Sequence, residues 1–517
     1  MKKNQLSIVI LLLLSFLLTI RGEVKAERAG NYRFVVPGDS ITSTTCTRED
    51  PCDLRYAIDF ANSGDIIIVH SGLYTPQLMG DDFLFIDKSL TLLGSCTFDE
   101  TTPYECHPYE RSSILDAENS KRVIRIDGIS WDEQVHIEGF TIKNGYGFGP
   151  PTCYGGFDGC GGGILASNLN NLTLKNNTLR DNKSGNTSGA GGALNAYNID
   201  YLVVDKNSFL FNQATETGLA AGGAAFVANS GTPNAVVFSD NLIVGNETNT
   251  DNTSGSAGAG LVITSSNNVQ VNKNSFEYQN SLNQNMDLRG SSIYLSEITG
   301  YSIEGNKLKN NWGRADTYIS YNTEGSISKN KWWNNTIIYN LELVGNVKAD
   351  IFNNFLGREI LTTASRGGGT SNIYLHSQTL TNDVDIYFNT FAAATVGVDV
   401  GQNSFVDIFN NIFTELSTPI YLYPTNVTSV IDNNLFYDNS TNLNQGTNPI
   451  ITDPKLVDVA NGDFHLLPGS GAIDTAYVMD FDEDIDGETR PIGLGSTPYD
   501  VGADEFQVIN YLPLILQ

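Results

Sequence analysis

Basic residues are scarce in this sequence of 517 residues. Lys and Arg number 30 against 58 Asp and Glu, which gives a formal net charge of −28 at pH 7. Nucleic acids and anionic membrane surfaces bind proteins that present a basic footprint, so the composition argues against both as partners. An acidic balance of this size indicates solubility outside the cell or the binding of divalent cations.

Long hydrophobic runs are limited to the start of the chain. The run from Ile8 to Ile20 spans about thirteen residues, follows Lys2 and Lys3, and precedes a small-residue cleavage site at Ala26. This pattern predicts a secretory signal peptide over residues 1–26, because the apolar part is short for a membrane span. An uncleaved N-terminal anchor is the alternative. We expect no transmembrane segment after signal cleavage.

Cysteine is rare, and its placement is uneven. All six cysteines lie in the N-terminal third of the mature chain, and they form close pairs separated by 6, 10 and 7 residues. An even number after a signal peptide suggests disulfides, with local pairing as the simplest of the fifteen connectivities. No spacing typical of a zinc site occurs. The cysteines are Cys46, Cys52, Cys96, Cys106, Cys153 and Cys160.

Asparagine, in contrast, recurs two residues before a bulky apolar residue along the middle of the chain. The steps between these asparagines range from 22 to 35 residues, and the short ones cluster at 22–24. The series is Asn177, Asn207, Asn241, Asn274, Asn306, Asn330, Asn354, Asn389, Asn411 and Asn434. Short alternating segments such as Val406 to Ile408 precede most of them and are typical of half-buried strands.

This repeat predicts an all-β fold, a right-handed parallel β-helix of about a dozen coils. Three short strands and three turns fit in 22–24 residues, and each coil pairs with the next at a spacing of about 4.8 Å. We expect each asparagine to sit at a tight bend, to tolerate left-handed backbone angles, and to bond to its equivalents in a ladder. Disorder is disfavoured because aromatic and β-branched residues accompany every repeat.

The longer steps carry about ten extra residues rich in Ser, Thr, Asn and Gly, between Asn177 and Asn306. They predict loops extruded from one turn on successive coils. Loops stacked on one side of a solenoid often build its binding face, so partner recognition is expected there.

The two ends of the solenoid resemble known caps. Leu54, Ala57, Ile58 and Ala61 have helical spacing and predict a short capping helix before a first strand. The segment 52–58 is similar to the CSLREAI-type opening of secreted bacterial β-helix proteins, although Asp53 and Tyr56 replace its Ser and Glu.

At the other end, the order DP, GDFHL, GSGAID, DGETRP and DVGADE between residues 453 and 505 resembles the region called choice-of-anchor Q. Together these resemblances imply the pectin-lyase-like fold and an extracellular or cell-surface location, and no established activity. The expected organisation is a signal peptide (1–26), an N-terminal cap (27–63), the β-helix (64–450), the C-terminal region (451–506) and a short tail (507–517).

One acidic cluster suggests a cation site. Asp480, Asp482, Asp484 and Asp486 alternate and precede Gly487, as in the first half of a calcium loop. The expected Glu at position twelve is absent, so Asp474, Asp500 or Asp504 would have to complete the shell. Such an ion would stabilise the C-terminal region. The alternative is that these acids cap turns and pair with Arg490.

Candidate groups for chemistry are few. Lyases of this fold abstract a proton with Arg or Lys, and the candidate bases are Arg289, Arg314, Arg358 and Arg366. No Gly-His-Gly of the polygalacturonase kind occurs. Trp312 and Trp333 lie about one coil apart and are candidates for stacking on sugar faces, whereas Trp332 takes the inward position of its repeat.

We therefore expect an extracellular or cell-surface monomer that acts as a non-catalytic module and binds a polysaccharide or another cell-surface component. The alternative is a calcium-assisted polysaccharide lyase or glycoside hydrolase of the same fold.

Overall fold

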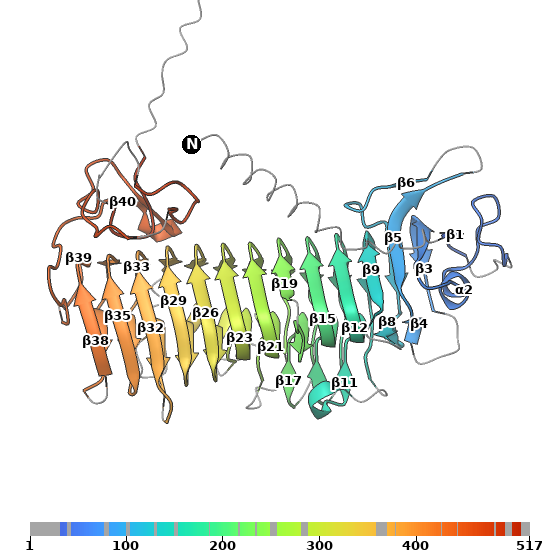
Figure 1. Ribbon diagram of the computed structural model, residues 1–517, viewed down its shortest axis with the longest axis horizontal. Coiled ribbons are helices and arrows are strands. Elements are labelled where there is room, and N and C mark those ends of the chain that lie inside the picture. Colours follow the sequence, from blue (N-terminus) through green and yellow to red (C-terminus); the bar gives the residue numbers. More distant parts are fainter. Residues whose placement is uncertain are drawn as a thin grey trace, which may run out of the picture.

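The computed structural model describes most of the mature chain (Figure 1). The predicted signal peptide and the last ten residues lie outside the described residues. The described ranges are 31–38, 43–76, 82–99, 104–128, 132–148, 153–185, 187–215, 218–232, 235–248, 256–280, 288–357, 370–377, 379–424, 427–441, 443–479, 482–491 and 499–507.

The chain forms a right-handed parallel β-helix, as the repeat predicts. Each coil contributes strands to three sheets, and strands of successive coils pair in parallel to build a long rod (Figure 1). The first sheet contains β4 (Asp82–Ile86), β8 (Arg122–Asp127), β18 (Ala225–Ala228), β25 (Trp312–Ser320), β28 (Thr336–Val344), β31 (Ser371–His376), β34 (Val396–Val400) and β37 (Thr418–Leu422).

The second sheet lies beside the first around the coil. It contains β1 (Tyr32–Val35), β2 (Asp65–His70), β5 (Leu90–Thr97), β9 (Gln134–Glu138), β19 (Val236–Ser239), β26 (Thr323–Ser328), β29 (Val347–Phe352), β32 (Asn382–Tyr387), β35 (Ser404–Phe409) and β38 (Val427–Asp432). Four strands run through the corner and belong to both sheets: β12 (Ile164–Lys175), β15 (Leu194–Asp205), β21 (Leu261–Asn272) and β23 (Ile293–Glu304).

The third sheet has thirteen strands, close to the expected dozen coils. They are β3 (Gly72–Tyr74), β7 (Ser113–Asp116), β10 (Phe140–Lys143), β13 (Thr178–Arg180), β16 (Ser208–Leu210), β20 (Leu242–Val244), β22 (Ser275–Glu277), β24 (Lys307–Lys309), β27 (Lys331–Trp333), β30 (Phe355–Leu356), β33 (Thr390–Ala392), β36 (Ile412–Thr414) and β39 (Leu435–Tyr437). Their inward side chains stack along the rod. The ring of Phe413, for example, lies 4.8 Å from that of Phe391 and 5.4 Å from that of Phe436.

The predicted asparagine ladder is present at the bend between the second and third sheets. It is continuous from Asn177 to Asn434, because each side-chain amide donates to the Oδ1 of the next asparagine. Asn330, for example, donates to Asn354 at 3.1 Å and is fully buried. Each such amide is paired inside the protein, where an unpaired one would be costly.

One expectation about this bend is wrong. The left-handed backbone belongs to the residue before the ladder asparagine, as at Lys329 (φ 56°) and Asn353 (φ 52°), and the ladder asparagines are not left-handed. The reason is geometric: the left-handed residue turns the chain, and the next side chain then points inward and bonds back to the carbonyl two residues earlier, as Asn330 does to Ser328 at 2.9 Å.

The N-terminal end is closed by helix α2 (Leu54–Asp59). Asp53 caps it, because its Oδ1 accepts hydrogen bonds from the backbone amides of Arg55 at 2.8 Å and Tyr56 at 3.1 Å. Strand β1 already pairs in parallel with β2, so the sheet begins ahead of Gly64.

The six cysteines form three local disulfides, as the simplest pairing predicts. They are Cys46–Cys52, Cys96–Cys106 and Cys153–Cys160. The second of these closes a small antiparallel pairing between β5 and β6 (Glu105–Cys106).

The C-terminal region contains the antiparallel strands β40 (Leu456–Asp458) and β41 (Asp463–Leu466) and the short helix η2 (Val459–Asn461). It lies against the third sheet near the end of the rod (Figure 1). The ring of Phe464 lies 5.8 Å from that of Trp333 and 5.4 Å from that of Phe355. Within the described ranges, no helix is long and apolar enough to cross a membrane.

Candidate functional site

The extruded loops contribute short strands that pair with one another in parallel. Their described parts stack into a short parallel ladder of β11 (Gly159–Cys160), β14 (Gly189–Ala190) and β17 (Ala220–Ala221), beside the helix η1 (Tyr154–Gly156). Single bridges extend this ladder to Ala257 and then to Arg289. The loop ladder therefore places Arg289 at the edge of the first sheet.

A cavity of about 280 Å³ opens at this edge, over strands β25, β28 and β31. We call it the arginine cleft. It is lined by Arg289, Tyr318, Tyr321, Glu342, Val344, Gly345, His376, Ser377, Thr379 and Leu380.

The strand register explains why these side chains meet. Parallel pairing aligns equivalent positions on neighbouring strands, so residues far apart in the sequence form one row along the rod. The row through the arginine cleft consists of Tyr294, Tyr318, Glu342, Tyr374, Asp399 and Tyr421, on strands β23, β25, β28, β31, β34 and β37.

Glu342 is the polar centre of the arginine cleft. Its side chain is 1% exposed and accepts hydrogen bonds from Arg314 Nε at 3.0 Å and Nη2 at 2.7 Å, and it contacts His376 Nε2 at 3.1 Å. Burial raises the pKa of Glu342, but the hydrogen bonds from His376 and Arg314 outweigh burial and bring the pKa below its usual value. Glu342 is therefore an ionised anchor for the two basic side chains.

Aromatic rings surround this centre. Tyr374 stacks on Tyr339, with ring centroids 4.5 Å apart, and on His376, at 4.6 Å. The guanidinium of Arg314 lies 5.6 Å from the centroid of Tyr339, and that of Arg289 lies 5.5 Å from the centroid of Tyr318. Rings stacked on one another and on cations are held in place, so the cleft is preorganised.

The lining of the arginine cleft carries one arginine and one carboxylate, Arg289 and Glu342, so it lacks the strongly acidic balance of the whole protein. Arg314 is paired with Glu342, whereas Arg289 is exposed and has no carboxylate partner among the described residues. Asp399, further along the row, is half-buried, and burial raises its pKa. One unpaired guanidinium beside ring faces suits a ligand that carries both an anionic group and a flat apolar face, as acidic sugars do.

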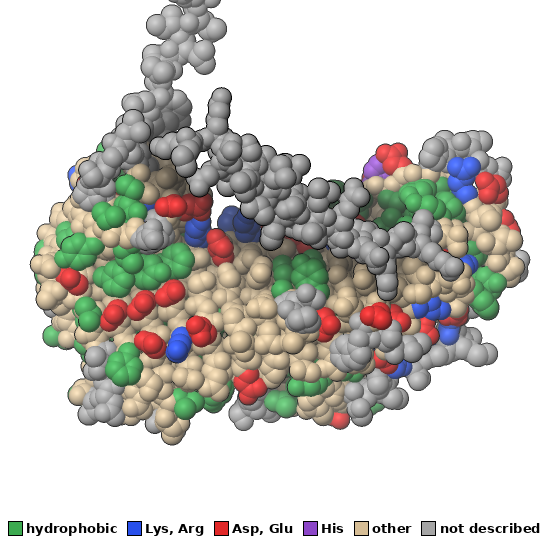
Figure 2. Space-filling model, viewed as in Figure 1, with side chains coloured by type: hydrophobic (Ala, Val, Ile, Leu, Met, Phe, Trp, Pro, Cys, Tyr) green, Lys and Arg blue, Asp and Glu red, His purple; other side chains and the backbone are tan. Residues whose placement is uncertain are grey.

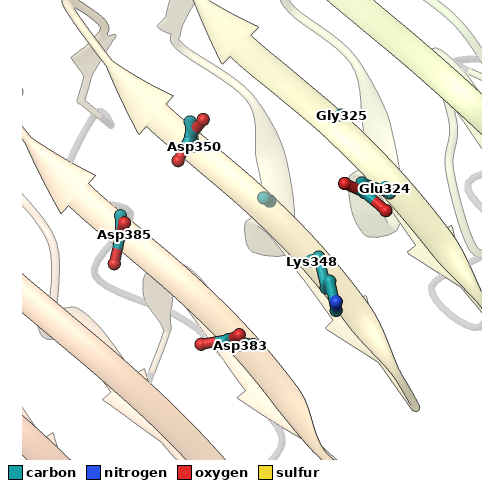
Figure 3. Close-up of a pocket in the computed structure, with 7 residues that line it drawn as sticks. Glu324, Gly325, Lys348, Asp350, Asp383 and Asp385 are labelled. Atoms are coloured by element: carbon teal, nitrogen blue, oxygen red, sulfur yellow. The ribbon is translucent and has the colours of Figure 1, made fainter.

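A second hollow, of about 160 Å³, lies on the second sheet and is acidic. Asp350 and Asp385 project from neighbouring strands, with Asp383, Lys348 and Glu324 beside them (Figure 3). Burial raises the pKa of both Asp350 and Asp385, and neighbouring carboxylates add to the effect at Asp385.

The same face carries a stack of rings. Asp407 continues the acidic row on β35, and Phe352, Tyr387 and Phe409 stack beside it with centroids 5.2 and 5.3 Å apart. Figure 2 shows this row of acidic side chains next to a hydrophobic patch. Outside the hollow itself the face is flat, and it offers none of the buried, converging polar groups that the arginine cleft has.

The structure does not bring the two candidate tryptophans together. Trp312 begins β25 and aligns with Thr336, whereas Trp333 ends β27 and aligns with Lys309. The ring of Trp333 packs against Phe464 of the C-terminal region. Trp332 is 1% exposed, as its inward position predicts.

Two of the four candidate arginines, Arg289 and Arg314, meet at the arginine cleft, and Arg358 and Arg366 lie outside the described residues. The sequence reasoning missed Glu342, His376 and the tyrosines. The signal that could have found them is register: aligning successive strands of the first sheet places Tyr318, Glu342 and Tyr374 in one row.

Among the described residues, the predicted calcium ligands Asp482, Asp484 and Asp486 do not gather into one group of three. Asp480 lies outside the described residues, and Asp482 is exposed. Asp484 is buried and accepts hydrogen bonds from the backbone amides of Asp486, Glu488 and Glu505 at 2.8–3.1 Å. Asp484 therefore shapes its turn, which is the alternative role that the sequence offered.

Among the described residues, one group brings three possible metal ligands within 4.8 Å of one another: His465, Asp486 and Asp504. His465 Nε2 lies 2.5 Å from Asp486 Oδ2, and Lys331 Nζ lies 3.2 Å from Asp486 Oδ1. The hydrogen bond to Asp486 raises the pKa of His465 to about 9, so His465 is protonated at neutral pH and has no lone pair for a metal.

Comparison with known proteins adds information about the fold alone. No protein-family model and no curated protein matches the sequence. The chain is similar to the crystal structure of pectate lyase Pel9A, at 12% identity and a TM-score of 0.38 over 93% of this chain and 98% of that chain. It is also similar to the PL6 family alginate lyase AlyGC, at 14% identity and a TM-score of 0.40 over 78% of this chain and 52% of that chain.

A third similar structure is PfbA, a surface adhesin of Streptococcus pneumoniae. It is 12% identical, with a TM-score of 0.34 over 76% of this chain and 89% of that chain.

Proposed function

We propose that the protein is an extracellular, non-catalytic module that binds an acidic polysaccharide in the arginine cleft. The observation that carries this proposal is Arg289, an exposed guanidinium that has no carboxylate partner in the described part of the chain and lies over Tyr318 at the edge of a cleft lined with rings. A guanidinium binds carboxylate or sulfate groups with two hydrogen bonds, and adjacent rings stack on sugar faces.

A polymer suits the site better than a small molecule because the row continues beyond the cleft. Asp399 and Tyr421 follow Tyr374 on the next two strands, and 43% of Tyr421 is exposed. Consecutive strands are about 4.8 Å apart, so this row extends along the rod by a distance that several sugar units would span.

Action outside the cell is supported by composition and crosslinks. Three disulfides persist in oxidising compartments and are rare in the cytosol. The predicted signal peptide agrees with export. We also propose that the protein acts as a monomer, which light scattering after size exclusion would test.

The direct test is a binding panel of acidic and neutral polysaccharides of similar length, measured by calorimetry with the secreted protein. We expect binding to the acidic members, weakening as salt rises, and none to the neutral ones. Binding to neutral glycans alone, or to none, would refute the proposal.

Catalysis is the second candidate, because a lyase would also need guanidinium groups beside a bound uronate. The arginine cleft supplies Arg289 and Arg314, but Glu342 is committed to its two basic partners. Incubation with the same panel, followed by absorbance of unsaturated products and by reducing-end assays, distinguishes catalysis from binding without catalysis. Products that disappear in Arg314→Ala would overturn the non-catalytic assignment.

Calcium binding in the C-terminal region stays a separate proposal, with Asp480, Asp482, Asp484 and Asp486 as the predicted ligands and Asp504, which lies in one group with Asp486, as a further carboxylate. A cation there would have to replace Lys331 and the proton of His465 as partners of Asp486. The melting temperature with calcium and with a chelator tests it, and an unchanged value at pH 7 and pH 9 would contradict it.

Stacking of Trp312 and Trp333 on sugar faces also remains a prediction. Loss of glycan binding in Trp312→Ala or Trp333→Ala would support it.

A further inference from the structure

A carboxylate without solvent exposure lies between the two segments that carry the cleft arginines. Asp316, in β25, is 0% exposed. Its Oδ1 accepts hydrogen bonds from the hydroxyls of Ser291, at 3.1 Å, and Ser292. Its Oδ2 accepts from Asn335 Nδ2 at 3.0 Å and from Asn311 Nδ2 at 3.4 Å.

Asp316 thereby joins the strand of Arg314 to the loop segment of Arg289. Ser291 and Ser292 follow Arg289 closely and donate their backbone amides to the carbonyls of Ala315, at 2.8 Å, and Asp316, at 3.0 Å. The amide of Arg314 in turn donates to the carbonyl of Leu288 at 2.7 Å. All of these bonds act between the two arginine-bearing segments.

A second amide ladder ends at the same carboxylate. It runs through the turns between the third and first sheets, by way of Asn182, Asn212, Asn246, Gln279, Asn311 and Asn335. The side-chain amides of Asn311 and Asn335, the last two residues of this ladder, donate to Asp316. The two carboxylate oxygens of Asp316 therefore accept four hydrogen bonds and donate none. This geometry is that of an ionised carboxylate.

We infer that Asp316 is a positioning residue of the arginine cleft, which holds Arg289 relative to Arg314 while it is ionised and releases it when it is protonated. The inference rests on the proposed function and adds a regulation of that site: binding of a polyanion should weaken in acid. A protonated carboxyl must donate a hydrogen itself, so it cannot keep all four bonds.

Burial raises the pKa of Asp316 to about 6, against the opposing hydrogen bonds from Ser292, Ser291 and Asn311. None of the charged side chains on the adjoining elements bonds to it. The titratable groups on those elements are Arg289 before β23, Tyr294, Glu297, Tyr301 and Glu304 of β23, Lys307 and Lys309 of β24, Arg314 and Tyr318 of β25, Lys331 of β27, and Tyr339 and Glu342 of β28.

The experiment measures the affinity of the full chain for a dextran sulfate oligosaccharide between pH 8 and pH 5. Sulfate stays ionised over this range, so the charge of the probe is constant. We expect roughly fivefold to tenfold weaker binding at pH 5 than at pH 8 in the wild type. Asp316→Asn replaces one acceptor oxygen by a donor NH2 group and so mimics the protonated carboxyl without titrating, and we expect its affinity to be weak at every pH and not to fall further in acid.

Asp240→Asn is the matched control, since Asp240 is exposed in the turn between β19 and β20. It should keep the wild-type profile. An equal loss in Asp316→Asn and in the wild type would overturn the inference.

A second readout does not depend on any ligand. Hydrogen exchange at the amides of Ser291 and Ser292, corrected for intrinsic rates, should accelerate below pH 6 in the wild type and stay constant in Asp316→Asn. If the probe fails to bind at every pH, the proposed function fails while this exchange still tests Asp316. Constant exchange in the wild type would refute the positioning role by itself.

Discussion

The guanidinium of Arg289 lies over the ring of Tyr318, with 5.5 Å between its central carbon and the ring centroid. Arg289 is the last bridge of the loop ladder, and Tyr318 belongs to the first sheet. The pair therefore joins two parts of the fold that the sequence presents separately, the extruded loops and the coils. In the proposed function, the loops would contribute to recognition by placing this arginine at the sheet.

Arg289→Ala should remove binding of acidic polysaccharide. The variant deletes the exposed guanidinium, so we expect at least a tenfold loss of affinity at low salt and little change in the melting temperature, because Arg289 is exposed and forms no ion pair among the described residues. Calorimetry with the acidic members of the panel measures it.

Lys307→Ala is the control for that variant, since it removes the same charge from an exposed position of β24, on the third sheet. Arg289→Lys should recover part of the affinity, because the charge returns without the planar fork. Equal losses in Lys307→Ala and Arg289→Ala would show a general charge effect and contradict the cleft.

Glu342→Gln should separate stability from binding. Without the carboxylate, Arg314 and His376 lose their buried anionic partner, and we expect a cost of about 3 kcal/mol in the free energy of unfolding. Binding of an acidic glycan should be retained or become tighter, since the cleft gains net positive charge.

Chemical denaturation and calorimetry check the two effects. Glu324→Gln, at an exposed position of the second sheet, should change neither. Lost binding in a folded Glu342→Gln would instead mean that Glu342 contacts the ligand.

Asn330→Ala should destabilise the rod strongly. The Asn330 amide donates to Ile303 and Ser328, and its Oδ1 accepts from the backbone of Asn306, so the substitution leaves several buried groups unpaired. We expect a loss of about 3 kcal/mol or more, measured by urea denaturation. Gln402→Ala, at an exposed amide, should cost less than about 0.5 kcal/mol. A similar small effect at Asn330 would contradict the ladder's role.

The fold was predictable because its signal repeats. The asparagines and the alternating strands recur in every coil, and each repeat supports the same geometry, so the β-helix and the local disulfides follow from the sequence. The arginine cleft was only half predictable. Arg289 and Arg314 were candidates by residue type, but Glu342 and Tyr374 become neighbours only through strand register, which depends on loop lengths that vary from coil to coil.

For the aspartate cluster and the tryptophans, the sequence pattern suggested a role, but the structure gives these side chains other contacts. Asp484 has the spacing of a calcium ligand, yet three backbone amides of a turn occupy its oxygens. Trp333 is one coil from Trp312 in the sequence, yet it meets Phe464 of the C-terminal region. In both cases a contact from a distant segment decides the role of the side chain, and local sequence does not contain that contact.

His465 should make the attachment of the C-terminal region sensitive to alkaline pH. The hydrogen bond to Asp486, with a further one to Asp463, raises the pKa of His465 to about 9, above its value in an unfolded chain. The stabilisation is therefore fully present below about pH 6.5 and is lost as the pH rises through about 9. The melting temperature of the wild type should fall across that range.

His465→Gln removes the titrating group, so its melting temperature should be lower at pH 6 and should converge with that of the wild type near pH 10. His107→Gln, at an exposed position near the N-terminal end, is the matched control and should run parallel to the wild type. If the melting temperature of His465→Gln also runs parallel to that of the wild type, the contact with Asp486 does not depend on protonation of His465. Convergence would show that protonated His465, together with Lys331, holds Asp486 and so binds the C-terminal region to β27.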